Sequence, residues 1–187
     1  MTNADFRTID ELRDPVSRFV YDMMTQQVHL PKALAFRLIR YGARDHARTP
    51  MQWNDGVNAG FNAGAEPWQC LNGNYREINA ARDLKSDRSV YRFYQRLFAY
   101  RREQPLAIHG ETRLHLPKSR RMIVYSREKD GKRLLVAGNF SCRERTLRLP
   151  LSFRPDRLSV ALSNYDGQTI AREMKLRPYE AIVFEEI

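Results

Sequence analysis

The hydrophobic pattern of this 187-residue chain changes once, near Leu114, and that change limits the folds open to it. Before this point apolar residues recur three and four positions apart, which is typical of one face of a helix. After it they form short runs, several of them alternating with polar residues, which is typical of strands. Helices followed by strands predict an α+β fold rather than repeated βαβ units.

Three helices are expected in the first part of the chain. The first begins with Asp14 as N-cap and Pro15 at the first helical position. The second runs from Pro31 to about Tyr41, and the third spans residues 88–103 and ends before Pro105. The first and third are expected to carry one apolar face each. The faces of the first and third helices consist of Val16, Phe19, Val20, Met23 and Met24, and of Val90, Phe93, Tyr94, Leu97 and Phe98.

The second part predicts a small antiparallel β-sandwich, because short strands recur at regular spacing with turn residues between them. Residues 129–132, Lys-Asp-Gly-Lys, predict a hairpin turn, and Asp166-Gly167 predicts another. Asn139 begins a glycosylation pattern, but it lies in an apolar, strand-like run, so a structural role is expected. The expected strands include residues 122–125, 134–137, 147–149, 158–162 and 181–184.

Composition argues against several classes of partner. The net charge is +10, but the arginines are scattered and no nucleic-acid-binding motif accompanies them, so no nucleic acid is expected. No apolar run approaches the roughly 20 residues of a membrane span, so no membrane partner is expected. Cys70 and Cys142 fit no metal or redox spacing and are expected to be free thiols of a cytoplasmic protein.

The stretch with the strongest functional signal is GARDHARTPMQW, residues 42–53. It holds Arg44 and Arg48 and then Thr49-Pro50, where any helix must end. A long loop is expected from Arg44 to about Ala80. Long loops inside compact proteins usually serve a function.

This stretch resembles the α-glucosidase branch of glycoside hydrolase family 13, which comprises oligo-1,6-glucosidases, dextran glucosidases and trehalose-6-phosphate hydrolases. The resemblance covers almost the whole chain, in family order. It is also carried by MTN (residues 1–3), IDELRD (9–14), NYREIN (74–79), SNYDG (163–167) and LRPYEAIVFE (176–185).

The resemblance implies a C-terminal remnant of a (β/α)₈ barrel followed by an antiparallel β-sandwich. Residues 1–113 would comprise the long connection between strand eight and helix eight, together with helix eight itself. Residues 114–187 would form the C-terminal domain. It implies hydrolysis, with retention, of terminal α-glucosidic bonds in short oligosaccharides or trehalose 6-phosphate. In such enzymes the nucleophilic Asp, the acid Glu and a third Asp precede the MTN segment. We therefore expect Met1 to be an internal position of a longer protein, and the chain alone to be inactive.

Two arginines are the candidate substrate-binding residues. An arginine presents a planar fork of donors that suits two adjacent sugar hydroxyls or a carboxylate. In the resembling enzymes the first arginine of (S/G)RDNAR contacts the terminal glucose, and it matches Arg44, although His46 stands where Asn is usual. Arg48 matches the second arginine and either contacts the ligand or anchors the turn that follows it. Arg44 is favoured as the ligand contact and Arg48 as the anchor.

Aromatic residues of the loop are further candidates. Trp53, Phe61 and Trp68 could stack on sugar faces, but large aromatic residues in a loop more often pack its own core. No local acid is assigned to catalysis, because none lies at the end of a recognisable barrel strand. We expect Asp10, Glu11, Asp14, Asp45 and Asp55 to be caps or surface charges.

No metal or cofactor is expected, since His29, His46, His109 and His115 share no ligand spacing. The expected partner is a small oligosaccharide or glucoside, bound by the longer parent protein. The alternative is a non-enzymatic carbohydrate-binding or interaction module derived from the same family.

Overall fold

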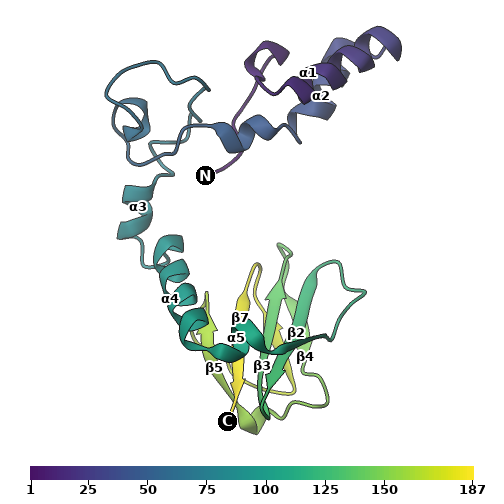
Figure 1. Cartoon of the computed structure of the whole chain (residues 1–187), viewed down its shortest axis with the longest axis vertical. Coiled ribbons are helices and arrows are strands. Elements are labelled where there is room, and N and C mark those ends of the chain that lie inside the picture. Colours follow the sequence, from purple (N-terminus) through teal and green to yellow (C-terminus); the bar gives the residue numbers. More distant parts are fainter. The chain divides into compact units, whose positions relative to one another are not determined.

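The computed structural model describes residues 1–187, and the chain divides into two compact units, Met1–Ser89 and Val90–Ile187. The first unit consists of short helices and irregular loops, and the second of two helices followed by strands (Figure 1). The fold class predicted from the sequence, helices followed by an antiparallel sheet domain, is confirmed. The domain boundary after residue 113 stays a prediction.

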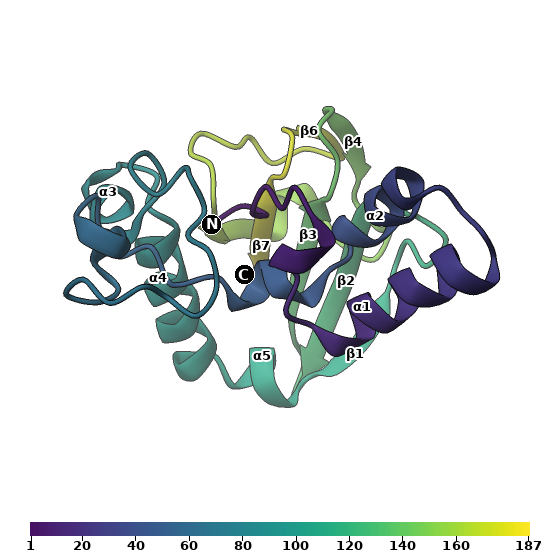
Figure 2. The same cartoon turned by 90° about the horizontal axis from the view of Figure 1, so that it is seen from above.

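The first helix, α1 (Pro15–Asp22), begins as the sequence predicts. The Asp14 carboxylate caps it by accepting a hydrogen bond from the Ser17 N–H at 3.1 Å. The α-helix then widens into a π-helix over Met23–Gln27, where the Val28 N–H donates to the Met23 carbonyl at 3.2 Å. The second helix, α2 (Lys32–Arg40), lies beside α1 (Figures 1 and 2).

The apolar face of α1 is covered only in part, since Val20, Met23 and Met24 are half-buried. The side chains of Val16 and Phe19 are 51% and 68% exposed, because no other element of this unit covers them. The small buried core instead joins the N-terminal segment to the residues around α2. It consists of Ala4, Phe6, Leu12 and Ala43, with Ile9, Phe36 and Ile39 packed against it.

A helix that the sequence reasoning missed, α3 (Ala80–Lys85), ends the long loop. Asn79 caps it: its side-chain oxygen accepts a hydrogen bond from the Arg82 N–H at 2.9 Å. Asparagine is among the strongest N-cap residues, so Asn79 followed by Ala80-Ala81 was a signal that could have placed this helix.

The second unit begins with α4 (Val90–Glu103), the third helix that the periodicity predicts. Pro105 ends it as expected, but the same residue also starts a further short helix, α5 (Pro105–His109). Phe93 and Leu97 are half-buried, whereas the other members of the predicted apolar face are exposed, so only its centre is covered. The exposed members are Val90, Tyr94 and Phe98.

Seven strands form two antiparallel sheets. The larger sheet has the order β1-β2-β3-β7-β5, and the smaller pairs β4 with β6. The short helix α5 packs on β2 and β3 of the larger sheet. The strands are β1 (Glu111–Leu114), β2 (Met122–Lys129), β3 (Lys132–Asn139), β4 (Arg145–Arg148), β5 (Leu158–Ser163), β6 (Glu173–Leu176) and β7 (Ala181–Glu186).

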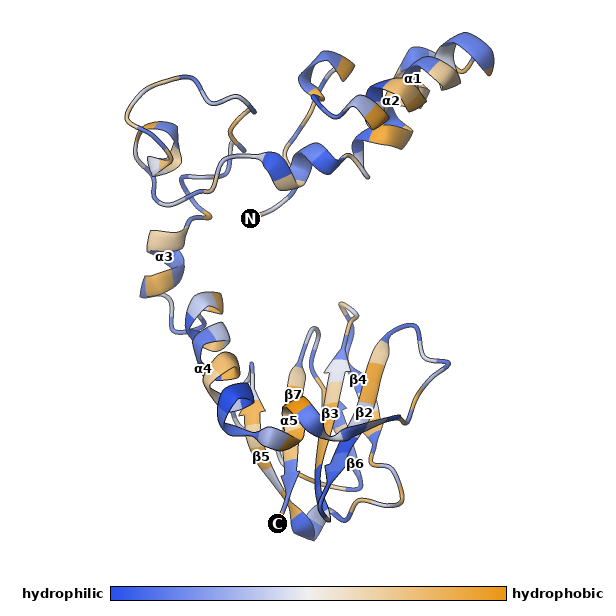
Figure 3. Ribbon diagram, viewed as in Figure 1, coloured by the Kyte–Doolittle hydropathy of each residue, from blue (hydrophilic) through white to orange (hydrophobic).

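Both sheets contribute alternate residues to one buried core, as the predicted sandwich requires. Met122 and Val124 of β2 share it with Leu147 of β4, Leu176 of β6 and Phe184 of β7. Strands β5 and β7 are coloured largely as hydrophobic in Figure 3. Burial of each such side chain stabilises the unit by about 1.5–3 kcal/mol before conformational entropy is counted.

One of the two predicted hairpin turns is confirmed. Lys129 pairs with Lys132, and Asp130 and Gly131 between them have φ angles of 52° and 74°, both in the left-handed region that a two-residue hairpin turn needs. The hairpin predicted at Asp166-Gly167 is wrong. Gly167 does turn the chain, with φ of 74°, but the strands on either side, β5 and β6, belong to different sheets.

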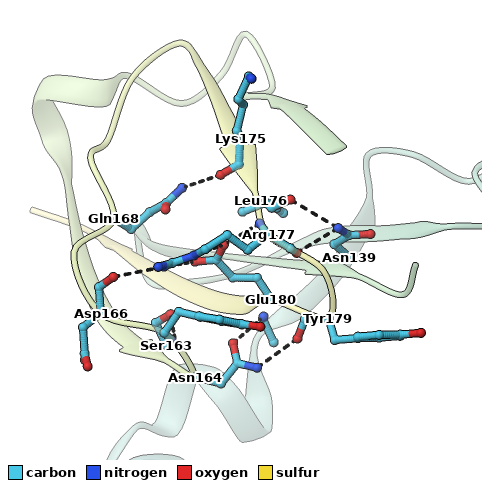
Figure 4. Close-up of polar contacts among 12 residues, drawn as sticks. Asn139, Ser163, Asn164, Asp166, Gln168, Lys175, Leu176, Arg177, Tyr179 and Glu180 are labelled. Atoms are coloured by element: carbon cyan, nitrogen blue, oxygen red, sulfur yellow. Dashed lines mark hydrogen bonds and ion pairs between the residues drawn. The ribbon is translucent and has the colours of Figure 1, made fainter. Parts of the chain in front are cut away.

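The motifs SNYDG and LRPYEAIVFE bond to each other in this unit (Figure 4). The Glu180 carboxylate, fully buried, accepts hydrogen bonds from the Arg177 N–H at 2.7 Å and from the Arg177 guanidinium at 2.9 and 3.1 Å. The same guanidinium donates to the Asp166 carbonyl at 3.0 Å. Asn164 closes the turn by donating to the Tyr179 carbonyl and accepting from the Ala181 N–H, at 2.9 and 2.8 Å.

A second buried side chain fixes the start of the same region. The Asn139 amide donates to the carbonyls of Arg143, Leu176 and Arg177 at 2.8, 3.2 and 2.9 Å. All of these groups belong to the sandwich, so the two motifs maintain its shape. The structural role predicted for Asn139 is therefore confirmed.

Replacement of Glu180 by Ala should lower the free energy of unfolding of the second unit by about 2 kcal/mol, because the change leaves the Arg177 N–H and guanidinium without their acceptor. Urea unfolding followed by circular dichroism measures this. The control is Glu144→Ala, which removes an ion pair with Lys175 at the surface and should change stability little. Equal effects of the two changes would contradict the role given to Glu180.

Limited proteolysis should separate the two units. The second unit has the larger buried core and a continuous sheet, whereas the first contains long loops and a partly covered apolar helix face. We expect early cuts within residues 1–85 and a resistant C-terminal product, identified by mass spectrometry. Uniform resistance of the whole chain would contradict this.

Candidate functional site

The segment that carries Arg44 follows α2 directly. Ala43 is buried in an extended conformation, and residues Arg44–Arg48 form a 3-10 helix. Thr49 returns to extended geometry with φ of −61° and ψ of 145°, as its position before Pro50 predicts. This short helix thus places Asp45 in the interior and leaves Arg44 and Arg48 exposed.

Asp45 anchors this segment to the start of α1. Its carboxylate is fully buried, and one oxygen accepts hydrogen bonds from the N–H groups of Arg13 and Asp14 at 3.1 and 3.0 Å. The expectation that Asp45 is a cap or surface charge is therefore wrong. Its partners lie 31 and 32 residues earlier in the chain, and local patterns carry no information on such a contact.

Arg48 binds two acidic side chains. Its guanidinium lies 3.2 Å from a carboxylate oxygen of Asp14 and 3.7 Å from the other oxygen of Asp45. Both acids are buried, whereas the Arg48 side chain is 39% exposed. Arg48 therefore neutralises the two carboxylates that join α1 to the 3-10 helix, as expected of an anchor.

The ionisation of Asp14 reflects this arrangement. Burial alone would raise its pKa, but the hydrogen bonds from Ser17 and the positive charges of Arg48 and Arg44 outweigh burial, so that the pKa lies below its ordinary value of 3.8. The Ser17 hydroxyl contributes one of these hydrogen bonds, at 3.2 Å. Asp14 therefore acts as a charged cap and ion-pair partner.

Arg44 differs from Arg48 in having no hydrogen bond or ion pair, and its side chain is exposed. Arg44 acts on its surroundings only through its positive charge, which helps to lower the pKa of Asp14. The structure therefore brings Arg44, Arg48 and Asp14 near one another and fixes the backbone under Arg44, while its guanidinium donors stay available.

His46 lies on the same 3-10 helix, and its structural role was not predicted from the sequence. Its Nδ1 accepts a hydrogen bond from the Ala4 N–H at 3.1 Å, and its Nε2 lies 2.6 Å from the Arg40 carbonyl oxygen. Its ring also packs against Phe6, with 5.0 Å between centroids. The signal that could have found it is the departure from the usual Asn at this position.

The loop that follows holds its shape through backbone and amide contacts. The N–H groups of Trp53 and Asn54 donate to the Ala59 carbonyl at 2.9 and 3.1 Å. Gln52 is buried and donates to the Asn74 side chain at 2.9 Å. Gly60 has φ of 70° and lies so close to the Asn54 side chain that any Cβ there would collide with it.

The aromatic candidates do not form a core for this loop. Trp53, Phe61 and Trp68 are 53%, 49% and 65% exposed, so each leaves much of its ring surface open. The expectation that they pack the loop's own core is wrong. Their open rings suit stacking on a sugar, but no contact in the structure shows that they meet at one place.

Other classes of site find little support in residues 1–187. No group of three or more His, Cys, Asp or Glu side chains could hold a metal ion. None of the helices is both long and apolar enough to span a bilayer. Cys70 and Cys142 are free, exposed thiols, as their spacing predicts.

Two family models match the chain. Residues 17–110, half of the chain, match the α-amylase catalytic domain, and residues 122–183 match the C-terminal domain of the α-amylase SusG. The oligo-1,6-glucosidase of Bacillus cereus is 35% identical over 99% of this chain. The trehalose-6-phosphate hydrolase of Bacillus subtilis (strain 168) is 33% identical over 98%. The chain spans about a third of the length of each, 33% in both cases.

Solved structures show the same relationship. The trehalose-6-phosphate hydrolase of Bacillus licheniformis superposes with a TM-score of 0.87 at 32% identity, over 99% of this chain and 34% of its own. The trehalulose synthase of Pseudomonas mesoacidophila MX-45 superposes with a TM-score of 0.85 at 31% identity, over 99% of this chain and 33% of its own.

The fold and these matches define the class: part of an α-amylase catalytic domain followed along the chain by an antiparallel sheet domain. The chain belongs to the α-amylase family, glycoside hydrolase family 13. The resemblance to the α-glucosidase branch of this family, which the sequence motifs predicted, is confirmed.

The lowered pKa of Asp14 gives a pH prediction. A group whose folded-state pKa is depressed stabilises the fold above its ordinary value of 3.8, and this contribution is lost as the pH falls through the folded pKa. Asp14→Asn should therefore lower the stability of the first unit at neutral pH and flatten its decline between about pH 5 and 2. Urea unfolding followed by tryptophan fluorescence measures this, since Trp53 and Trp68 both lie in that unit.

The matched control is Asp55→Asn, at an exposed acid of the loop. It should leave the decline with pH unchanged. If the two variants show the same pH dependence, the ion-pair role of Asp14 is wrong.

Proposed function

We propose that this chain forms the C-terminal part of an α-glucosidase-type enzyme that acts on short α-linked oligosaccharides or trehalose 6-phosphate, and that Arg44 contacts the terminal sugar. One observation carries the assignment. Of the two arginines on the 3-10 helix, Arg48 is bound to Asp14 and Asp45, whereas Arg44 has no partner. A rigid backbone under an available guanidinium suits the recognition of adjacent hydroxyls.

The names of the relatives support the substrate class, since they include oligo-1,6-glucosidases and trehalose-6-phosphate hydrolases. Retaining hydrolysis requires two carboxyl groups about 5–5.5 Å apart. We propose that these come from the part of the protein that corresponds to the remaining length of the relatives. Trp53 and Phe61 are proposed as stacking surfaces beside Arg44, and Arg48 as the residue that holds the segment. A cytoplasmic location stays a prediction.

The sugar-contact assignment is tested with Arg44→Ala. In a full-length protein carrying this segment, the change should lower kcat/KM for isomaltose by about 100-fold, because it removes charged hydrogen bonds to the substrate. In the chain itself, isomaltose should raise the melting temperature of the wild type but not of Arg44→Ala.

Arg37→Ala is the matched control, since it removes an equal charge from an exposed position on α2. It should leave both readings unchanged. Arg48→Ala should lower the melting temperature without sugar present. Wild-type kinetics in Arg44→Ala would show that the wrong arginine has been assigned. Sugar binding by a full-length protein that hydrolyses nothing would favour the non-enzymatic carbohydrate-binding module.

A further inference from the structure

Trp53 is fixed through its backbone, although its side chain is 53% exposed. Its N–H donates to the Ala59 carbonyl at 2.9 Å, and its own carbonyl accepts from the Ala81 N–H at 2.9 Å. The first bond joins Trp53 to the loop that follows it, and the second joins it to the first turn of α3. The exposed indole therefore extends from a backbone that is held on both sides.

The Ala59 carbonyl belongs to a left-handed turn. Asn58, Ala59 and Gly60 have φ angles of 48°, 57° and 70° in succession. Glycine adopts this conformation readily and asparagine tolerates it, but it is unfavourable for alanine. Ala59 nevertheless has it, and its side chain is fully buried. Such a backbone persists only where the surrounding structure imposes it, and it is concentrated at active sites and ligand-binding sites.

The Asn54 side chain supports this turn from both sides. Its Oδ1 accepts a hydrogen bond from the Gly56 N–H at 2.9 Å, and the Gly56 carbonyl accepts from the Ala59 N–H at 3.0 Å. The Asn54 N–H donates to the Ala59 carbonyl at 3.1 Å. A Cβ placed on Gly60 would lie 2.5 Å from the Asn54 Nδ2, so the amide packs directly against Gly60. One amide thus contacts the loop both before and after Ala59.

We propose that Asn54 is a positioning residue, whose amide fixes the left-handed turn that presents Trp53 to the sugar. This inference rests on the function proposed above, in which the indole is a stacking surface beside Arg44. A surface that is ordered before the sugar arrives loses less conformational entropy on binding. Tryptophan suits this role because its large ring has only two rotatable side-chain bonds. Loss of the Asn54 amide should free the turn and weaken stacking without displacing Arg44.

The first test removes the acceptor and then restores it. Asn54→Ala should lower the affinity of the chain for isomaltose about five-fold, because the hydrogen bond that orders the turn is lost. Asn54→Asp keeps an oxygen for the Gly56 N–H and should bind isomaltose as the wild type does. Titration calorimetry measures both affinities. An unchanged affinity in Asn54→Ala, or a loss that Asn54→Asp does not restore, would overturn the proposal.

The matched control is Asp55→Ala, which shortens the exposed side chain next to Asn54. It should leave the affinity for isomaltose unchanged. A loss in Asp55→Ala equal to that in Asn54→Ala would show that any shortened side chain of this loop has the same effect, and it would overturn the specific role given to Asn54.

Hydrogen exchange reports on the turn without any sugar. The Trp53 amide, which donates to the Ala59 carbonyl, should lose about five-fold protection in Asn54→Ala and keep it in Asn54→Asp. The Arg18 amide, which donates to the Asp14 carbonyl at the start of α1, should exchange equally in all variants. Equal protection of the Trp53 amide in the wild type and in Asn54→Ala would overturn the proposal.

Gly60→Ala disturbs the same turn from its other end, and it keeps the proposal testable if Asn54→Ala does not fold. The added Cβ collides with the Asn54 amide, and the φ of 70° is unfavourable for alanine. This variant should therefore lose protection at the Trp53 amide and affinity for isomaltose. Gly73→Ala, where a Cβ meets no other atom, is its control. Wild-type binding and protection in Gly60→Ala would overturn the proposal.

A double-mutant cycle decides whether Asn54 acts through Trp53. Asn54→Ala should cost about five-fold in isomaltose affinity in the wild type, but less than about two-fold in a Trp53→Ala background. Equal losses in both backgrounds would overturn the positioning role and leave the proposed function in place. If Trp53→Ala binds isomaltose normally, the stacking and the positioning role both fail. Arg44→Ala should abolish binding while the Trp53 amide stays protected, and normal binding by this variant would show that the sugar contact is wrong.

Discussion

Each unit of this chain depends on one fully buried carboxylate that accepts hydrogen bonds from backbone N–H groups. In the first unit it is Asp45, which holds the start of α1. In the second it is Glu180, which holds the turn before β7. A buried carboxylate without such partners is strongly unfavourable, so each acid requires its neighbours to stay in place. In both units an arginine completes the arrangement, Arg48 in one and Arg177 in the other.

This requirement explains why two arginines four residues apart behave differently. Asp45 and Asp14 together bury two negative charges near the start of α1, and Arg48 is the cation that lies against both. Without it, the two carboxylates would repel each other in a region that water reaches poorly. Arg44 makes no ion pair of this kind. The short helix therefore combines a residue committed to the fold with a residue available for a ligand.

The elements with strong local signals were predictable. Asp14 and Pro15 marked the start of α1, and Asp130-Gly131 marked the hairpin between β2 and β3, because caps and tight turns depend on a few adjacent residues. Strands β1 and β6 and the helices α3 and α5 were missed, since each has four to six residues and shows no clear period. The hairpin expected at Asp166-Gly167 failed for another reason. The turn itself forms, but the sheet that each strand joins is decided by distant partners.

The candidate site shows the same division. The motif identified Arg44 and Arg48, and the anchoring role favoured for Arg48 agrees with its ion pairs. The hydrogen bonds that bury Asp45 and the hydrogen bond from the Ala4 N–H to His46 involve residues 31 to 42 positions away, which a local pattern cannot reveal. The exposure of Trp53, Phe61 and Trp68 was likewise missed, because it depends on which surfaces of the unit are covered.

The similarity of this chain to several relatives also indicates that this span of the fold does not decide the choice of substrate. Across nearly the whole of this chain, identity is 31–35% to an oligo-1,6-glucosidase, a trehalose-6-phosphate hydrolase and a trehalulose synthase. Proteins with different names thus share this span to a similar degree. A shared scaffold can present a common sugar contact, but it cannot by itself distinguish the linkages or reactions that those names imply.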